Sequence, residues 1–386
     1  MDSNAQSTFV VDLAAYAHNL RVIREMVPKE CAVLAVVKGN AYGHGSVAIA
    51  QRALQAGAAM LGVATVEEAI VLRSASITAP IMVLVQPPPE TFSEVIENNL
   101  RLCLSGVSAA ERLGELARKH NRVIPIHCKV DTGMGREGLD PDTVIAALRH
   151  ITRVSHIDIE GVATHFSSSE DIDDPATANQ IRLFKQILKQ IEKEGIPYEM
   201  AHAANSGAIV AQPTSTFDMV RPGLMTYGVW PTETRPEKIP LHPVGRWESK
   251  VVLIKELPTG WSIGYGHTFT TQRPTRTAVI PVGYADGYKA QFGNNAEVLI
   301  RGHRCRVLGR ISMDQTVVDV TEVPGVTIGD TAVLIGSVHQ VSVANIQKEI
   351  KAHCPDQLAI ILLRRMMLRL AGMVCERRGL QVLVSG

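Results

Sequence analysis

Residues 34–46 read Leu34-Ala-Val-Val-Lys38-Gly-Asn-Ala-Tyr42-Gly-His-Gly45-Ser46. A short apolar run precedes one lysine, a glycine-punctuated turn with a tyrosine comes after it, and a helix is expected to begin at Ser46. This is the order of a βα unit. Because α/β folds place their chemistry at the carboxyl ends of their strands, Lys38 is the first candidate functional residue.

The same unit recurs along the first part of the chain. A helix is expected from Asp12, and short apolar runs then alternate with polar turns and helices. The expected strands are 33–37, 61–64, 81–85, 100–104, 123–130, 156–164, 199–202 and 217–220. Thr65 with Glu68 and Ser108 with Glu111 have the spacing of capping boxes. These units predict an α/β fold, a (β/α)8 TIM-like barrel, with a doubly wound open sheet as the competing architecture.

The composition changes after Trp230. Prolines at 231, 236, 240 and 243 indicate a linker, and most of the chain beyond them is strand-like. The expected strands are 247–254, 277–282, 297–300, 305–308, 316–320 and 332–335, with one helix at 343–350. We therefore divide the chain into a barrel domain, residues 1–240, and a mainly β C-terminal domain, residues 241–386.

Charge and composition exclude several classes of protein. The 386 residues include 39 Lys and Arg against 38 Asp and Glu, and only 4% are aromatic, which argues against a nucleic-acid partner. The six cysteines are scattered without a CxxC pair and are expected to be free thiols. No signal peptide and no apolar run of ~20 residues is visible, so we expect a cytoplasmic protein without a membrane partner.

The residues around Lys38 allow three interpretations. The lysine could be a solvated residue at the end of a strand. The segment Gly43-His-Gly45-Ser-Val-Ala48 could be a dinucleotide-binding loop, with Glu67 about 20 residues downstream. Alternatively, Lys38 could be a Schiff-base lysine, which requires an amine desolvated or placed near other cations. The residues alone leave these alternatives open.

Further polar loops come after other expected strands. Lys129-Val-Asp131-Thr-Gly-Met-Gly-Arg136 contains Asp-Thr-Gly, but an aspartic protease needs two such loops and the chain has one. Thr164-His165-Phe166, His202-Ala-Ala-Asn205-Ser206 and Arg221-Pro-Gly223 offer hydroxyl and backbone N–H groups suited to phosphate. A single strand histidine is typically a core residue. In the second part, Tyr265 lies between two glycines. No zinc helix motif, Walker loop or Gly-x-Ser-x-Gly elbow is present, and we assign no metal site.

Taken together, these motifs resemble those of the bacterial alanine racemases, which bind pyridoxal 5′-phosphate (PLP). The resemblance includes Val36-Val-Lys38-Gly-Asn-Ala-Tyr-Gly-His-Gly45, Asp131-Thr-Gly-Met-Gly-Arg136, Thr164-His-Phe166, Ala204-Asn-Ser206, Met219-Val-Arg-Pro-Gly223, Gly264-Tyr265-Gly266, Gly283-Tyr-Ala-Asp-Gly287 and Ser312-Met-Asp-Gln315. It extends from residue 9 to about residue 335 in the family's order. It implies interconversion of L- and D-alanine, supplying D-alanine for peptidoglycan, in a homodimer with shared active sites.

The resemblance also implies roles for individual residues. Lys38 would bind PLP covalently and act as one base, and Tyr265 of the partner subunit would be the other. The phosphate would be held by Tyr42, Ser206, Gly223 and Leu224. Arg221 would face the pyridine nitrogen, with His165 linking it to Tyr265. Arg136 and Met313 would contact the small amino-acid substrate, and Lys129, which is often carbamylated in this family, would orient Arg136.

Two departures from the family pattern concern the substrate. The family's Tyr-Arg-Val-Pro-Arg segment near the C-terminus has no counterpart, because no tyrosine is found beyond Tyr288. Ala290 also replaces an expected arginine. A racemase of serine or of a larger amino acid is therefore an alternative. A non-catalytic PLP-binding protein is a further one, although such proteins resemble only the first half of the chain.

Overall fold

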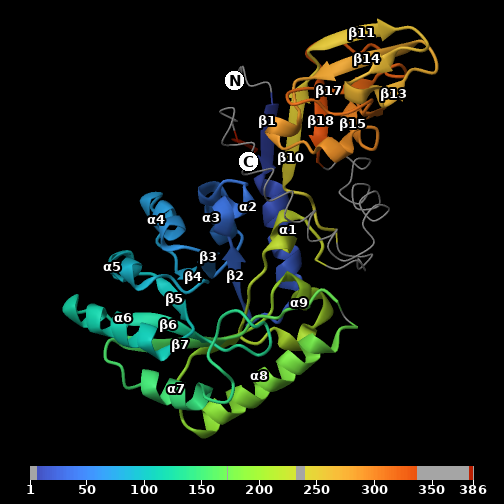
Figure 1. The fold of residues 1–386 in the computed structure, drawn as a ribbon. Helices are drawn as coiled ribbons and strands as arrows, with labels where there is room; N and C mark the ends of the chain where they lie inside the picture. Colours follow the sequence, from blue (N-terminus) through green and yellow to red (C-terminus); the bar gives the residue numbers. More distant parts are fainter. Residues whose placement is uncertain (1–6, 172, 232–239, 337–381, 386) are drawn as a thin grey trace. The chain divides into compact units, whose positions relative to one another are not determined.

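The computed structural model describes residues 7–171, 173–231, 240–336 and 382–385. The chain divides into two compact units, one of residues 15–41 and 46–242, the other of residues 1–14, 42–45 and 243–386. In the first unit, parallel strands close into a barrel of eight within residues 32–220 (Figure 1). The predicted (β/α)8 barrel is therefore confirmed and the open sheet is excluded.

Strands and helices alternate around this barrel. The strands are β2 (Ala32–Val36), β3 (Met60–Val63), β4 (Ile81–Val83), β5 (Arg101–Leu104), β6 (Ile124–Lys129), β7 (Ile157–Ala163), β8 (Met200–His202) and β9 (Met219–Val220). The helices are α1 (Leu13–Met26), α3 (Ser46–Gln55), α4 (Val66–Ser74), α5 (Phe92–Glu97), α6 (Val107–Lys119), α7 (Val144–Ile151), α8 (Pro175–Lys193) and α9 (Ser206–Ala211). All eight expected strands are found, with ends shifted by a few residues.

The two predicted capping boxes have different outcomes. The Thr65 hydroxyl accepts the N–H of Glu68 and caps α4. The Glu68 carboxylate, however, accepts the N–H groups of Ala64 and Gly39, each at 2.7 Å, so it links α4 to the turn after Lys38. The box at Ser108 is wrong, because the N-cap of α6 is Gly106, two residues earlier, and it has no side-chain cap.

The second unit is built from β-strands. A six-stranded sheet has the order β16-β15-β18-β10-β1-β19, a three-stranded sheet is β11-β14-β17, and β12 pairs with β13. The strands are β1 (Ser7–Asp12), β10 (Gly245–Lys250), β11 (Leu253–Leu257), β12 (Ser262–Ile263), β13 (Phe269–Thr270), β14 (Thr275–Ile280), β15 (Glu297–Ile300), β16 (His303–Arg306), β17 (Thr316–Asp319), β18 (Thr331–Ile335) and β19 (Val382–Ser385). The predicted mainly β domain is confirmed.

Two details of this unit differ from the sequence-based boundaries. Residues 7–12, placed in the barrel by the 1–240 division, form β1 and pair with β10, because alternating Phe9 and Val11 bury one face of that strand beside Trp247. The expected strand 247–254 is two strands in different sheets. Pro236 of the linker and the expected helix 343–350 lie outside the described residues.

Within the described residues, no helix is both long and apolar enough to cross a bilayer. Four cysteines, Cys31, Cys103, Cys128 and Cys305, are free and buried. Cys354 and Cys375 lie outside the described residues.

Candidate active site

Lys38 lies directly after β2 and begins a turn with unusual backbone geometry. Gly39, Asn40, Ala41 and Tyr42 have φ values of 63°, 52°, 54° and 54°. Left-handed backbone costs about 1–2 kcal/mol for an L-residue with a Cβ, and consecutive residues of this kind are rare. The Asn40 side chain accepts the N–H of Ser46 at 2.8 Å, and Glu68 accepts that of Gly39. These bonds hold a strained turn beside the lysine, as is typical of functional sites.

The amine of Lys38 lies in a cationic environment. Burial is the largest cause that lowers its pKa, followed by the Arg136 guanidinium, and Lys129 acts in the same direction. Glu68 and Glu137 oppose this shift with a smaller effect. A lysine with a lowered pKa is neutral, and therefore nucleophilic, for more of the time at neutral pH. The lowered pKa favours the Schiff-base interpretation over a solvated lysine.

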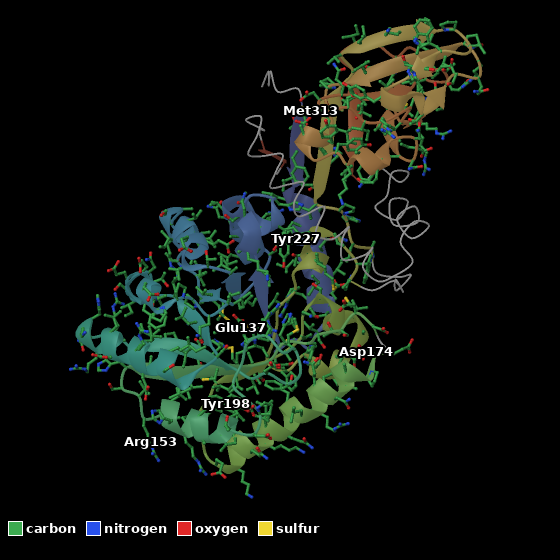
Figure 2. The ribbon with its side chains drawn as sticks, viewed as in Figure 1. Glu137, Arg153, Asp174, Tyr198, Tyr227 and Met313 are labelled. Atoms are coloured by element: carbon green, nitrogen blue, oxygen red, sulfur yellow. The ribbon has the colours of Figure 1, made fainter. Side chains whose placement is uncertain are left out.

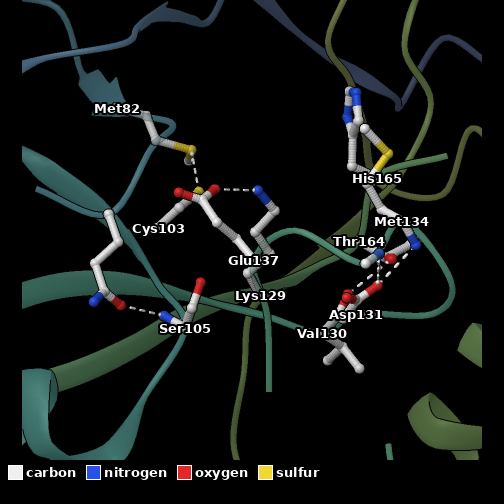
Figure 3. A network of polar contacts seen from close by, with 12 residues as sticks. Met82, Cys103, Ser105, Lys129, Val130, Asp131, Met134, Glu137, Thr164 and His165 are labelled. Carbon is white, nitrogen blue, oxygen red and sulfur yellow. Dashed lines mark hydrogen bonds and ion pairs between the residues drawn. The ribbon is translucent and has the colours of Figure 1, made fainter. Parts of the chain in front are cut away.

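The loop after β6 is shaped by Asp131. Its Oδ1 accepts the N–H groups of Gly133 at 3.0 Å, Met134 at 2.8 Å and Gly135 at 3.1 Å (Figure 3). Burial acts to raise the pKa of Asp131, but these backbone hydrogen bonds outweigh it and the pKa is lowered. The carboxylate therefore organises the loop that presents Arg136, and its hydrogen bonds are the backbone contacts of a structural loop rather than the shared proton of an aspartic protease.

Arg221, which comes directly after β9, is buried and donates hydrogen bonds to four acceptors. These are His202 Nδ1 at 2.6 Å, the carbonyls of Thr164 at 2.8 Å and Ala203 at 2.9 Å, and His165 Nδ1 at 3.2 Å. Burial lowers its pKa to about 10, so the guanidinium stays charged at neutral pH. Arg221 is thus held in one orientation by backbone and imidazole together.

The bonds of Arg221 determine the tautomers of the histidines. Arginine has only donors, so Nδ1 of His202 must accept and its Nε2 carries the proton. His202 Nε2 then donates to His127 Nδ1 at 2.9 Å, and His127 Nε2 donates to Glu160 Oε2 at 2.8 Å. Arg101 Nε donates to both Glu160 oxygens at 2.7 and 2.9 Å. We call Arg101, Glu160, His127, His202 and Arg221 the polar chain of the barrel.

The pKa values of the polar chain agree with these tautomers. Burial, and next the Arg221 charge, place the pKa of His202 well below its ordinary value. Burial also lowers the pKa of His127, against the opposing effect of Glu160. Both imidazoles are therefore neutral, as their hydrogen bonds require. His202 is a satisfied core residue, as expected, and its bonds extend to Arg221.

His165 lies among the cations of the site. Burial lowers its pKa well below 6.5, followed by the charges of Arg221, Lys129, Arg136 and Lys38. All four charges lower the pKa of the same imidazole, so their side chains lie near it. The carboxyl ends of β2, β6, β7 and β9 therefore meet at one end of the barrel. Its Nδ1 accepts from Arg221, so its Nε2 is the protonated nitrogen.

Ser206 organises a set of anion-binding donors. Its Oγ accepts the N–H of Gly223 at 2.9 Å and of Met225 at 3.3 Å, and Asn205 caps the start of α9. Because the Ser206 oxygen accepts both bonds, its own O–H proton remains available to an anion at the start of the 3-10 helix Leu224–Tyr227. With a buried amine of lowered pKa and a fixed guanidinium, this donor set fits PLP.

The remaining predicted residues belong to the second unit. Tyr265 is 69% exposed and Met313 is 53% exposed. Gly264 and Gly266 have φ values of 74° and 71°, which explains the glycines on either side of Tyr265. The Met313 carbonyl accepts the N–H of Ala285 at 3.0 Å. Figure 2 labels Met313 in the second unit and Glu137 in the barrel unit.

Sequence reasoning missed several residues that shape the site. Glu68 was found only as a helix cap, and Glu137, Glu160 and His127 were not singled out. Gln180 of α8 was also missed; it donates to the Thr132 hydroxyl and the His165 carbonyl. The signal available for Glu160 and His127 was a polar residue inside an apolar strand, which needs a buried partner.

Comparisons with known proteins agree over nearly the whole chain. A model described as "Alanine racemase, N-terminal domain" matches residues 11–231, and one described as "Alanine racemase, C-terminal domain" matches residues 244–366. The "Alanine racemase 2" of Caldanaerobacter subterraneus is 40% identical over 327 residues, 84% of each chain. The alanine racemase of Halothermothrix orenii is 39% identical over 84% of this chain and 86% of its own.

Solved structures give the same result. The alanine racemase of D-cycloserine-producing Streptomyces lavendulae has a TM-score of 0.87 and 33% identity, covering 100% of this chain and 98% of its own. That of Bartonella henselae, described with covalently bound pyridoxal phosphate, has a TM-score of 0.83 and 29% identity, covering 99% and 100%. On its motifs, fold, site and relatives, the chain belongs to the alanine racemase family.

Proposed function

We propose that Lys38 and Tyr265 are the two bases with which this PLP-dependent amino-acid racemase interconverts L-alanine and D-alanine. Racemisation removes a proton from one face of the substrate Cα and delivers one to the other face, so two bases on opposite sides are the minimum machinery. The observation that carries the proposal is the buried amine of Lys38, with its lowered pKa, at the barrel end that also holds Arg221 and Ser206.

The barrel residues would hold the cofactor at its phosphate and at its ring. Ser206, the backbone N–H groups of Gly223 and Leu224, and the hydroxyl of Tyr42, from the turn after Lys38, would bind the phosphate. When bound, PLP supplies the electron sink that makes the substrate Cα–H acidic. Arg221 would lie at the pyridine nitrogen and would not give it a proton, since an arginine with a pKa of about 10 stays charged. In that role Arg221 would weaken the electron sink and disfavour side reactions such as transamination.

The substrate carboxylate would be bound by Arg136, with Met313 beside it. His165 would link Arg221 to Tyr265; its Nδ1 accepts from Arg221, which leaves its Nε2 proton to be donated.

We further propose a homodimer in which each barrel is completed by its partner's second unit. Tyr265 and Met313 are exposed side chains of the second unit and are therefore accessible to another subunit. The absence of disulfides among the four described cysteines supports a cytoplasmic location, and the product D-alanine would serve peptidoglycan synthesis.

The first test is chemical. Borohydride reduction of the purified holoenzyme, with peptide mapping of the product, should place the cofactor on the peptide that contains Lys38. Label on another lysine, or a protein that takes up no added PLP, would refute the assignment.

The second test concerns the shared site. Lys38→Ala and Tyr265→Phe should each be inactive alone, while a reassociated mixture should recover about a quarter of the wild-type activity, because half of the dimers are hybrids with one intact site. No recovery from dimers shown to exchange subunits would contradict the shared-site proposal.

Substrate choice is tested separately. Initial rates for L-alanine, L-serine, L-lysine and L-arginine should rank alanine first. The missing C-terminal tyrosine and Ala290 motivate the alternative of a broader or different specificity, which alanine ranking below another substrate would support. The segment after residue 336 that would settle this lining lies outside the described residues, except for β19.

A further inference from the structure

Gln180 of α8 makes four hydrogen bonds with its side-chain amide, and the residue is only 2% exposed. Its Nε2 donates to the His165 carbonyl at 3.1 Å and to the Thr132 hydroxyl at 3.3 Å. Its Oε1 accepts the backbone N–H of Ser167 at 3.0 Å and the hydroxyl of the same residue at 3.2 Å. A backbone carbonyl can only accept and a backbone N–H can only donate, so these partners determine the orientation of the amide.

The hydrogen bond to Thr132 continues into the loop after β6. Thr132 Oγ1 lies 2.7 Å from Thr164 Oγ1, and the Thr164 hydroxyl donates to the Val130 carbonyl at 2.9 Å (Figure 3). A hydroxyl has one proton, so Thr132 must donate to Thr164 and accept from Gln180. A Cβ on Gly133 would lie 3.4 Å from Gln180 Cγ, so the same loop also packs against the stem of Gln180. The direction of every bond from Gln180 to Val130 is therefore determined.

These bonds hold the two loops that carry proposed site residues. The loop after β6 leads to Arg136, and the loop after β7 contains His165. Arg221 also holds the second of these loops, through the Thr164 carbonyl at 2.8 Å and His165 Nδ1 at 3.2 Å. A buried donor or acceptor that loses its partner is costly. Because both loops are bound to one amide, a shift of either loop would leave a polar group of Gln180 unpaired.

We propose that Gln180 is a positioning residue that fixes Arg136 and His165 relative to each other. In the proposed function Arg136 binds the substrate carboxylate and His165 links Arg221 to Tyr265, so the inference rests on that function. A displacement of ~1 Å in such a site can cost roughly 100-fold in rate. Gln180 acts only through these two residues, because its amide is fully used in holding their loops.

The main test is Gln180→Met in the holoenzyme, which keeps the length of the side chain and removes both donors and the acceptor. Hydrogen–deuterium exchange should become about tenfold faster in peptides covering residues 130–137 and 165–168, as one lost hydrogen bond in each loop would give. For L-alanine, kcat/KM should fall by about tenfold or more, with KM higher as well as kcat lower. Partial unfolding alone would lower kcat and leave KM unchanged, so the two parameters separate positioning from stability.

Thr132→Val tests the two loops separately. Valine has nearly the shape of threonine without the hydroxyl, so this variant cuts the connection from Gln180 to Thr164 and keeps the bond to the His165 carbonyl. Exchange should become faster over residues 130–137 and stay at the wild-type rate over residues 165–168. Combined with Gln180→Met, the variant should add nothing further over residues 130–137, because the same connection is already lost.

Gln190→Met makes the same change at an exposed position of α8 and is the matched control, with exchange and both kinetic parameters expected at wild-type values. The proposal is overturned if Gln180→Met exchanges like this control in either loop, or if its KM for L-alanine is unchanged. If Gln180→Met does not fold, wild-type exchange over residues 130–137 in Thr132→Val overturns it. If the wild type carries PLP on Lys38 but does not racemise alanine, the proposed function fails, and the exchange rates still test whether Gln180 holds the two loops.

Discussion

Glu160 lies next to Arg101, at the end of the polar chain opposite Arg221. Replacing its carboxylate should lower the free energy of unfolding, although Glu160 touches neither proposed base. Its carboxylate is paired with Arg101 and accepts a hydrogen bond from His127. Burial acts to raise the pKa of Glu160, but the His127 and Arg101 interactions lower it from 4.5 to about 2. A difference of about 2.5 pKa units corresponds to roughly 3 kcal/mol. We therefore expect Glu160→Gln to lower the free energy of unfolding by about 2–3 kcal/mol at pH 7.

The sign of the pH dependence comes from the direction of the shift. Since the folded pKa lies below the unfolded one, the contribution is fully present above pH ~4.5 and is lost as the pH falls toward ~2. The difference between wild type and Glu160→Gln should therefore be constant from pH 7 to pH 5 and shrink below that range.

Urea denaturation at one fixed protein concentration measures this difference, since an oligomer's stability depends on concentration. Glu194→Gln is the matched control, because Glu194 pairs with Arg149 at the surface of the same unit and should cost less than about 1 kcal/mol. If Glu160→Gln cost no more than this control, the polar chain would not be the stabilising network described above.

Three further predictions concern the same unit. Ser206→Ala should weaken PLP affinity by about tenfold, because the substitution removes one hydroxyl and the acceptor of the Gly223 N–H. Equilibrium dialysis measures this affinity, and an unchanged value would place the phosphate elsewhere. Gly39→Ala meets no atom within 4 Å but must keep φ near 63°, so it should lower the free energy of unfolding by about 1–2 kcal/mol in urea denaturation, and an unchanged value would contradict the strained turn. His165 and His202 have folded pKa values below 6.5, so their contribution to stability is present above that pH and is lost below it. The free energy of unfolding should therefore fall as the pH drops below ~6.5, by up to ~1.4 kcal/mol per pH unit for each histidine. A free energy of unfolding that stays constant between pH 7.5 and 5.5 would contradict their neutral state.

Much of the fold comes from local pattern. Apolar runs such as 33–37 and 61–64 alternate with amphipathic helices, and this periodicity depends only on neighbouring residues. The strand β1 was assigned to the other unit, because its partner β10 lies more than 230 residues away and strand pairing is not a local property. The Ser108 capping box failed for a related reason, since spacing alone does not decide which residue begins a helix.

The residues of the site could likewise be predicted only in part from the sequence. Lys38, Arg136, Arg221, Ser206 and Tyr265 were predicted from the sequence because the motifs around them, taken together, resemble those of one family. Their effects on one another's pKa values could not be predicted from the sequence, because a pKa depends on burial and on charges from other strands. Glu137 lies next to Arg136 in the sequence, yet only the fold turns its carboxylate to Lys129. The polar chain from Arg101 to Arg221 exists only after barrel closure, which brings side chains from β5 to β9 together in a dry interior where each donor must find its acceptor.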